Sequence, residues 1–497
     1  MGAFDLDILL GTLSPDVLMI VFIGVLIGII VGAIPGLNGA IGISLLLPLT
    51  FAMDPQNGIL LLGGIYMGGM YGGSITAILL NVPGDVVAAP AAMEGYPLTK
   101  QGRAKEALYY SIFSSMVGGF LGVLTLILFT PPLANLALMF GPAEMFFISL
   151  SGLVVIGAIA GNNVYKSIFA ALLGLFISTI GVDMAAGAER FTFEAMTLRQ
   201  GINLIPIVLG LFCFAEMFLN IGKKSNEVMT YKDQSIKRMT VIKDVIKHKF
   251  LVVKSSLIGT FIGILPGVGT TLAVFMAYGE SKRTSKRRDQ FEKGNTEGIM
   301  AAESANNATV GSSMVPLLAL GVPGSPTTAI IAGALIIHGI VLGPSLFEQR
   351  PDVAYTFLYG MLLTVVAMGV IGAFGIKYFS YILKVRQEFI VPTVLIFALF
   401  GAYSIRNSLF DVLIAIIIGL FGVIFKKTGV PLAPVIIGVV LGPLIERNLT
   451  RAMTIAEAQN VPLIQYMLTN PLSIALLGFV ILLLVIVLKM RKKDFGA

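Results

Sequence analysis

Two Pro-Gly pairs interrupt long apolar stretches of the chain, and the residues around them are the first candidates for binding chemistry. Pro35-Gly36 lies in the middle of 17–52, and Pro266-Gly267 lies in the middle of 251–279. Because Pro lacks a backbone N–H and Gly tolerates most backbone angles, each pair predicts a break at the tip of a helical hairpin. The half-helix after the break would present free N–H groups and a positive dipole end to an anion. The candidate substrate-binding residues at these tips are Pro35, Gly36, Asn38, Gly39, Gly267, Gly269, Thr270 and Thr271.

A second pair of polar segments lies further along each half of the chain. Hydroxyls, amides and loosened backbone carbonyls at membrane depth suit both Na⁺ and carboxylate groups. A single Ser or Thr in an apolar helix is more often a packing residue than a ligand, so the clustering favours a site. These candidate substrate-binding residues are Ser74, Thr76, Asn81, Pro83, Gly84, Ser312, Ser313, Pro323, Gly324, Ser325, Thr327 and Thr328.

Acidic residues within apolar sequence are rare and mark ion or substrate pathways. Asp85 and Glu303 flank the broken segments, and Asn306-Asn307 follows Glu303 directly. We therefore expect Asp85, Glu303, Asn306 and Asn307 to take part in cation coupling. His338 is open to two interpretations, as a proton relay or, more simply, as a hydrogen-bonded residue at a helix end.

The composition defines the class of protein that must position these groups. Of 497 residues, 56% are apolar and only 12% are charged, with a mean hydropathy of +0.91, which excludes a soluble enzyme and indicates a polytopic membrane protein. One Cys and two His leave no disulfide framework or transition-metal cluster. The glycine runs lack the Lys of a phosphate-binding loop, and no Ser has a visible His and carboxylate partner, so we expect no enzyme and no cofactor other than Na⁺ as a coupling ion.

The chain is an internal duplication. Gly28, Gly32, Pro35 and Gly36 recur as Gly259, Gly263, Pro266 and Gly267, each pair 231 residues apart. Further on, 71–74 and 81–84 correspond to 310–313 and 321–324. One isolated break would have even odds of being a structural kink, whereas a matched pair in two halves favours a site.

Charge sets the orientation, because short loops rich in Lys and Arg stay cytoplasmic. Five crossings per half place the second half upside down relative to the first, and the net charge of +7 is explained by topology rather than by nucleic-acid binding. We predict an all-α fold of two inverted repeats with broken helices or re-entrant hairpins and about 11–12 transmembrane segments, with the N-terminus periplasmic and the C-terminus cytoplasmic. The expected divisions are a first membrane repeat at 1–222, a basic cytoplasmic linker at 223–250, a second, inverted repeat at 251–455, and a C-terminal helix with a basic tail at 456–497.

At these motifs the sequence resembles the TctA family, the large permease subunit of tripartite tricarboxylate transporters, over about residues 10–455. The resemblance is carried by Gly32-Ala33-Ile34-Pro35-Gly36-Leu37, Tyr71-Gly72-Gly73-Ser74, Asn81-Val82-Pro83-Gly84, Glu94-Gly95-Tyr96-Pro97, Glu303-Ser304-Ala305-Asn306-Asn307 and Gly321-Val322-Pro323-Gly324-Ser325-Pro326-Thr327-Thr328. It implies a permease in the bacterial inner membrane that works with a small four-helix membrane subunit (TctB-like) and a periplasmic solute-binding protein (TctC-like). It also implies import of a citrate-like carboxylate by symport with Na⁺ or H⁺. Asp85 and Ser304 depart from the family's usual Glu and Pro.

Two other classes compete with this interpretation. An ion channel with re-entrant pore loops would also contain such hairpins. An intramembrane enzyme would need a catalytic pair such as Asp85 with Glu303, and the helix-break setting does not favour it.

Overall fold

The computed structural model describes residues 6–159, 164–183, 187–222, 236–265, 270–382, 387–404 and 406–494. In these residues the chain is helical except for one antiparallel pair of two-residue strands, β1(Gly181–Val182) and β2(Glu189–Arg190). Six of the described helices are long and apolar enough to cross a membrane, and shorter apolar helices accompany them. The prediction of an all-α polytopic membrane protein is therefore confirmed.

The first half of the chain begins with a hairpin whose tip falls at the first Pro-Gly pair. Its α2 arm and its α3 arm pack on the long helix α4, which is buried throughout its most apolar stretch. The elements of this half are α1(Leu6–Thr12), α2(Pro15–Gly32), α3(Gly39–Leu46), η1(Leu47–Ala52), α4(Pro55–Leu80), η2(Val86–Ala88), α5(Ala89–Lys100), α6(Ala104–Ala137), α7(Pro142–Ile159), α8(Val164–Ser178), β1, β2, α9(Met196–Arg199), α10(Leu204–Val208), the π-helical segment η3(Leu209–Phe214) and α11(Ala215–Asn220).

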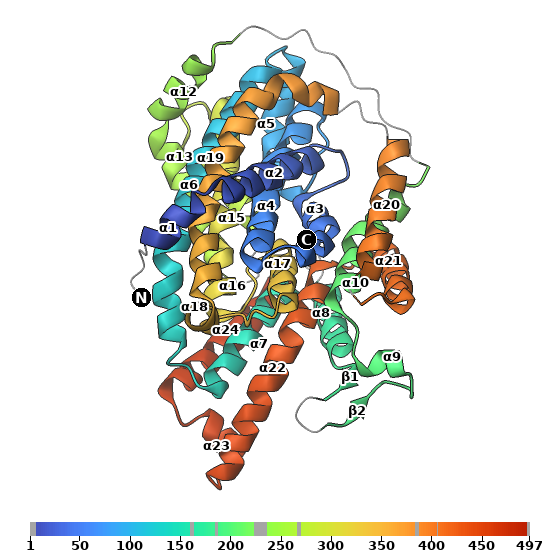
Figure 1. Ribbon diagram of the computed structural model, residues 1–497. Helices are drawn as coiled ribbons and strands as arrows, with labels where there is room; N and C mark the ends of the chain where they lie inside the picture. Colours follow the sequence, from blue (N-terminus) through green and yellow to red (C-terminus); the bar gives the residue numbers. More distant parts are fainter. Residues whose placement is uncertain are drawn as a thin grey trace.

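The second half also contains a helical hairpin followed by a central helix, here α13 and α14 followed by α15 (Figure 1). Its elements are α12(Arg238–Lys247), α13(Lys249–Ile264), α14(Thr270–Thr284), η4(Arg288–Gln290), α15(Thr296–Ser312), α16(Met314–Leu320), α17(Pro326–Ile337), α18(Ser345–Gln349), α19(Pro351–Ile382), α20(Gln387–Ser404), α21(Leu409–Thr428), α22(Ala433–Ala458), α23(Leu463–Met467) and α24(Pro471–Asp494). The packed pairs repeat as well. Helix α2 packs on α4 and α19, while α13 packs on α15 and α6.

Glycines make the same close helix contact in both halves. A Cβ on Gly28 of α2 would collide with the carbonyl oxygen of Ile65 in α4, and a Cβ on Gly259 of α13 would collide with that of Ala305 in α15. Successive contacts advance in the same direction along both helices, so each hairpin's first arm runs parallel to the helix it packs on. Only small residues allow backbones to approach this closely.

The corresponding helices of the two halves run in opposite directions. Tyr66 of α4 contacts Ser313, which directly follows α15. Met70 lies one turn later in α4 and contacts Asn306, which lies nearly two turns before Ser313. Helix α6 likewise runs antiparallel to α19, because Ile112 lies by Gly372 and Gly119 lies by Val365. The first arms of the two hairpins, α2 and α13, therefore also run in opposite directions.

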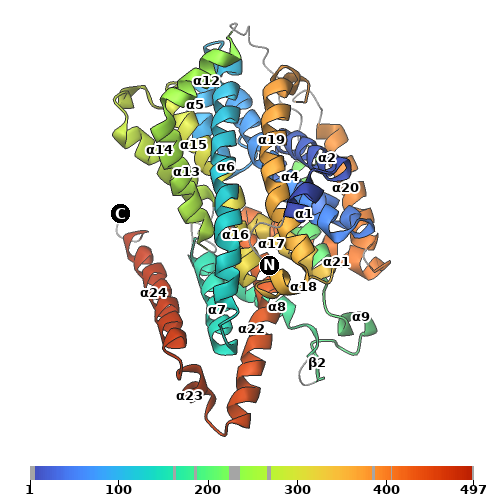
Figure 2. The same cartoon turned by 60° about the vertical axis from the view of Figure 1, so that its left-hand side comes forward.

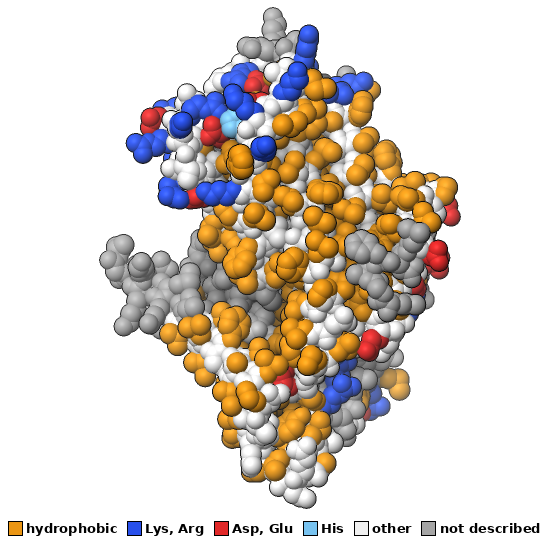
Figure 3. Space-filling view, turned by 90° about the vertical axis from the view of Figure 1, so that its left-hand side faces the viewer, with side chains coloured by type: hydrophobic (Ala, Val, Ile, Leu, Met, Phe, Trp, Pro, Cys, Tyr) orange, Lys and Arg blue, Asp and Glu red, His pale blue; other side chains and the backbone are white. Residues whose placement is uncertain are grey.

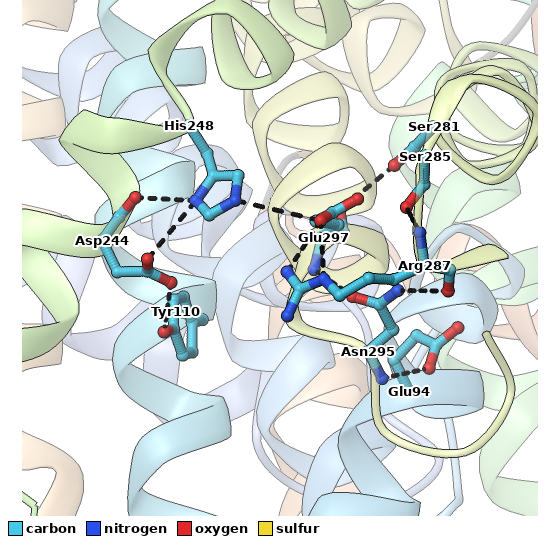
Figure 4. A network of polar contacts seen from close by, with 9 residues as sticks. All are labelled: Glu94, Tyr110, Asp244, His248, Ser281, Ser285, Arg287, Asn295 and Glu297. Carbon is cyan, nitrogen blue, oxygen red and sulfur yellow. Dashed lines mark hydrogen bonds and ion pairs between the residues drawn. The ribbon is translucent and has the colours of Figure 1, made fainter. Parts of the chain in front are cut away.

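Lys and Arg side chains gather at one end of the molecule, above a broad band of hydrophobic side chains (Figure 3). Helix α12, in the second part of the expected linker, lies at this end and is packed rather than loose, with Val241 and Val245 buried. Its C-terminal turn is held by a polar network (Figure 4). There Asp244 accepts a hydrogen bond of 2.6 Å from the Tyr110 hydroxyl, and His248 Nε2 lies 3.8 Å from a Glu297 oxygen.

The C-terminal helix lies on the outside of the molecule. Helix α22 leads through α23 to α24, which packs on α7 (Figure 2). The Ser473 hydroxyl donates a hydrogen bond of 2.5 Å to the buried Glu144 carboxylate of α7. Glu144, one of the acidic residues within apolar sequence, thus anchors a helix.

The structure corrects two details of the sequence interpretation. From the sequence, 131–141 is expected to be a neutral loop between two crossings, whereas α6 continues through Pro131 and Pro132 to Ala137. The register of the second repeated segment is also shifted by one residue. A Cβ on Gly84 would lie 3.1 Å from the Cα of Gly73, and a Cβ on Gly324 would lie 3.1 Å from the Cα of Ser313. Gly73 is therefore the counterpart of Ser313, 240 residues later, in place of Ser74.

Candidate functional site

A small cavity lies where the first hairpin tip meets the centre of α4 and the second half's α15. Its inner volume of about 10 Å³ is near the lower limit for a single water molecule. The lining comes from four segments that are far apart in the sequence, namely Asn38, Gly39, Gly69, Met70, Gly73, Asp85, Val87, Ala88 and Asn306. We call these residues the first half-site. Asn38, Gly39, Asp85 and Asn306 were predicted from the sequence.

The hairpin tip is shaped by Asn38, which caps helix α3. Its Oδ1 accepts a hydrogen bond of 3.0 Å from the Ile41 N–H. The first N–H groups of a helix have no acceptor within it, so the start of α3 remains a donor surface with positive dipole. Gly69 of α4 packs on Gly39, and a Cβ on Gly69 would lie 2.7 Å from the Gly39 Cα, so Gly69 has no room for a larger side chain. The helix start that the Pro-Gly break predicts is thus present, and anion binding there stays a prediction.

The break after α4 brings Asp85 to the cavity. Asn81 ends α4 in the left-handed conformation, with φ of 55°, and Asp85 then precedes the short helix η2. On the opposite wall Asn306 is 2% exposed, its Nδ2 donates a long bond of 3.5 Å to the Met70 carbonyl, and its Oδ1 has no partner. An unpartnered amide oxygen on a residue that lines a cavity is suited to a ligand that donates a hydrogen bond or carries positive charge.

The corresponding place in the second half is filled by protein. Tyr66 occupies the position equivalent to Asn306, 240 residues apart, and its hydroxyl lies 3.4 Å from Ser313 Oγ and 3.3 Å from Ser325 Oγ. Thr270, at the start of α14, is close enough to interact with the same hydroxyl. We call Tyr66, Thr270, Ser313 and Ser325 the second half-site.

The two breaks also differ in exposure. Asn81 and Asp85 are exposed, whereas their counterparts Gly321 and Ser325 are buried. Ser325 is 3% exposed and forms a capping box with Thr328 at the start of α17. The first half-site is therefore open and the second is closed.

The predicted cation residues fall into two groups. Asp85 and Asn306 face the first half-site, whereas Glu303 and Asn307, one turn apart on α15, face α6. There Ser115 links them, because Asn307 Nδ2 donates to Ser115 Oγ over 2.7 Å and Ser115 Oγ donates to Glu303 Oε2 over 3.0 Å. Ser74 lies beside Glu303 and not beside the cavity.

Several other predicted residues have structural surroundings. The hydroxyls of Thr76 and Ser312 bond to carbonyls of their own helices, at Gly73 and Ala308. Pro83 and Gly84 are half-buried in the first break, whereas Pro323 and Gly324 are buried in the second, and Thr327 and Thr271 are half-buried near helix starts. Pro35 and Gly36 are half-buried at the first tip. Gly267 and Gly269 lie outside the described residues. A substrate role for all of these residues stays a prediction.

Sequence reasoning missed Tyr66, Gly69, Met70 and Ser115. The signal for Ser115 was its place in a stripe of small residues at every third or fourth position, Ser111, Ser115, Gly118 and Gly122, on the face of α6 that packs on α15. Two titratable residues, Glu94 and His338, make structural contacts. The Glu94 carboxylate accepts bonds from three backbone N–H groups and from Tyr278, and His338 caps α17 with its Nε2 3.3 Å from the Thr50 hydroxyl.

The described residues contain no group of three or more His, Cys, Asp or Glu that could hold a transition metal. The polar atoms of the site are amide, hydroxyl and carboxylate oxygens together with helix N-termini. This set suits small anions and hard monovalent cations.

Broken helices that meet inside an apolar helical bundle define a polytopic membrane protein of the transporter type. The model of the Tripartite tricarboxylate transporter TctA family matches residues 18–437, and the chain belongs to this family. It is thus a transporter permease and not an enzyme. The chain is 36% identical over 470 residues to an "uncharacterized 52.8 kDa protein in TAR-I ttuC′ 3′region" of Agrobacterium vitis, covering 94% of this chain and 92% of the relative. An "uncharacterized protein in TAR-II ttuC′ 3′region" of the same organism is 36% identical over 220 residues, covering 44% of this chain and 89% of the relative. No solved structure gives a significant match.

Proposed function

We propose that this permease imports a citrate-like carboxylate, coupled to Na⁺ or H⁺, and that the substrate binds at the first half-site. The observation that carries the proposal is the meeting of the α3 N-terminus with Asn306 and Asp85 at one cavity. The positive end of α3, with the N–H groups of its first turn, would attract the carboxylate. Among the residues that the structure describes, no Arg lines this cavity, so backbone donors would take the place of an arginine clamp.

The duplicated architecture supports transport by alternating access. Equivalent helices of the two halves run antiparallel, as expected for inverted repeats, and each half-site takes one residue from the other half. Asn306 of the second half enters the first half-site, and Tyr66 of the first half enters the second. In such a design the two halves exchange conformations, so the closed half-site becomes the open one.

The first half-site is the more exposed of the two, and the contacts of its hairpin tip indicate which side of the membrane it faces. Gly36 at the first tip lies near Asn220, which donates to Glu216, and Glu216 pairs with Lys426. Lys426 lies beside Lys427 in the last turn of α21, and Lys and Arg next to the ends of membrane helices stay cytoplasmic. We therefore assign this conformation as open to the cytoplasm, in a bacterial inner membrane with a periplasmic N-terminus.

The cavity is too small for any di- or tricarboxylate, and this has a mechanistic consequence. Substrate entry requires the hairpin tip around Asn38 to move away from α4. The tip meets α4 at Gly39 and Gly69, and such a movement would also have to release Leu37 and Ile41, which are buried in the core.

The other components follow from the family. A solute-binding protein (TctC-like) would deliver the carboxylate to the outer face, and a small four-helix membrane subunit (TctB-like) would pack against the apolar surface in the bilayer. Coupling would use Asp85, Asn306, Glu303 or Asn307.

The test is citrate uptake into proteoliposomes that hold the permease and its small membrane subunit, with the binding protein outside and an inward Na⁺ or H⁺ gradient. We expect saturable uptake that requires the binding protein, and a loss of at least ten-fold in Asn38→Ala. Asn203→Ala is the matched control, because Asn203 caps α10 in the same way, with a bond of 3.0 Å to the Ile205 N–H, away from the cavity.

Two results would contradict the proposal. Equal losses in Asn38→Ala and Asn203→Ala would mean that only helix capping matters. Ion currents that neither saturate nor depend on the binding protein would favour the channel.

A further inference from the structure

A second polar cluster lies inside the helix packing, away from the cavity. It joins α15, α6 and α4 and is centred on the Glu303 carboxylate, which is 0% exposed. We call it the Glu303 cluster, and its members are Glu303, Asn307, Ser115, Ser111, Ser74 and Tyr71. Every member is fully buried.

Several buried oxygen atoms of the cluster have no hydrogen-bond partner. Glu303 Oε2 accepts from Ser115, and Asn307 Nδ2 donates to Ser115 and to the Glu303 carbonyl. The other Glu303 oxygen, Oε1, and the Asn307 Oδ1 have no hydrogen-bond partner. The hydroxyls of Tyr71, Ser74 and Ser111 are also without partners, although Ser74 and Ser111 lie close to the carboxylate.

The charge of the carboxylate is also uncompensated. Its neighbours in the described part of the chain are hydroxyl and amide groups, with no Lys, Arg or His acting on it. A lone ionised carboxylate in an apolar interior is too costly to persist, so it needs a cation or a proton. One proton would satisfy one acceptor, whereas a small cation would satisfy several at once.

The fold does not require this cluster. The position equivalent to Glu303 in the first half is Gly63, and the position equivalent to Asn307 is Met67, each 240 residues earlier. A Cβ on Gly63 would lie against Met361 and Phe357 of α19. The same helix contact is therefore apolar in one half and polar in the other, which argues for a ligand rather than for packing.

We propose that the Glu303 cluster binds one dehydrated Na⁺ ion. Glu303 Oε1 supplies the negative charge, and the oxygens of Asn307, Ser74 and Ser111 are the further ligands. This inference rests on the proposed transport function, for which it names the coupling ion and its site. Asn306, which neighbours Asn307 on α15, faces the carboxylate cavity, so ion binding on one face of α15 is positioned to influence substrate binding on the other.

The test is ²²Na⁺ binding to the purified permease, together with its melting temperature in NaCl and in choline chloride. We expect saturable binding and a melting temperature raised by Na⁺ in the wild type. Glu303→Gln should weaken Na⁺ binding at least ten-fold, because it removes the charge and keeps the shape. Ser115→Ala should weaken it several-fold through loss of the bond that orients the carboxylate. Ser304→Ala is the matched control, since its hydroxyl bonds to Met300 in its own helix, and it should bind Na⁺ normally.

The melting temperatures also distinguish a variant that has lost the Na⁺ site from one that fails to fold. Without Na⁺, Glu303→Gln should melt at or above the wild-type temperature, because a buried uncompensated charge is gone. Wild-type Na⁺ affinity in Glu303→Gln would overturn the proposal. The proposal would also be overturned if the wild type bound no Na⁺ while its melting temperature depended on pH through Glu303. That result would assign a proton to the site. Neither result concerns the carboxylate cavity, which citrate uptake tests separately.

Discussion

At equivalent positions of the two halves, Asp85 is exposed beside a cavity, whereas Ser325 is 3% exposed and close to the Tyr66 hydroxyl. The backbones around them are alike, with hairpin arms parallel to a central helix and a break after it. The side chains differ, since the first half-site presents two amides and a carboxylate, and the second presents the hydroxyls of Thr270, Ser313 and Ser325 together with Tyr66. The two halves thus share a backbone arrangement at these breaks but differ in the side chains that it presents.

The strongest test of this comparison addresses the shared glycine contacts. Gly28→Val and Gly259→Val each place a side chain against a backbone carbonyl, at Ile65 and at Ala305. Overpacking of a backbone contact costs about 3 kcal/mol or more, so both variants should lose most of the folded protein. The measurement is the monodisperse yield in size-exclusion chromatography. Gly478→Val is the control, because nothing lies within 4 Å of its added Cβ. If only one glycine variant failed, the two hairpins would not be equivalent.

The next effect concerns access to the two breaks. Val82 is half-buried, and its counterpart Val322, 240 residues later, is 0% exposed. We expect Val82→Cys to react with a membrane-impermeant maleimide at least ten times faster than Val322→Cys, and only from the cytoplasmic side. The native Cys213 is buried and gives a low background. Equal labelling rates would remove the distinction between an open and a closed half-site.

A smaller effect is expected from the bonds that hold the second half-site closed. Tyr66→Phe removes a hydroxyl that contacts Ser313 and Ser325 at 3.4 and 3.3 Å. Such long bonds contribute about 1 kcal/mol, so labelling of Val322→Cys should accelerate about five-fold in the Tyr66→Phe background. Tyr403→Phe, at an exposed position, should leave the rate unchanged. No acceleration in Tyr66→Phe would mean that ring packing alone closes this half-site.

The sequence was sufficient for the features that depend on local chemistry. Pro35-Gly36 predicted a helix break, and Asn38, Asp85 and Asn306 were recognised as polar groups in apolar sequence. The sequence could not show which residues far apart in the chain come into contact. Ser115 looks like an ordinary packing residue until the fold brings it to Glu303, and Tyr66 looks like part of an apolar helix until it meets Ser325. The one-residue register error at Gly73 arose because glycine and serine runs match equally well in neighbouring registers.

Proline effects were also misjudged for a physical reason. A Pro pair near the end of an apolar helix suggests a loop, because each Pro removes a hydrogen bond. In α6 the pair lies in the last two turns, where Pro131 is buried and the helix continues to Ala137. Packing around a buried turn can offset the lost bonds, and this cannot be read from local sequence.

The smallest expected effect comes from an ion pair that joins the two arms of the second hairpin and is replaced by apolar residues in the first. In the second hairpin Lys254 of α13 pairs with Glu280 of α14, whereas the equivalent positions of the first hairpin, 231 residues earlier, are Ile23 and Leu49. Hydrogen bonds from Arg283, followed by those from Lys254, lower the pKa of the Glu280 carboxyl to about 2.

A carboxyl whose folded pKa is depressed adds stability above its ordinary pKa and loses it as the pH falls towards the folded value. Glu280→Gln should therefore lower the melting temperature slightly at pH 7, by less in high salt, and by progressively less as the pH falls below about 4.5 towards 2. Differential scanning fluorimetry of the wild type and the variant across this pH range is the measurement. A difference that stays constant across the range would show that the charge of Glu280 does not hold the two arms together.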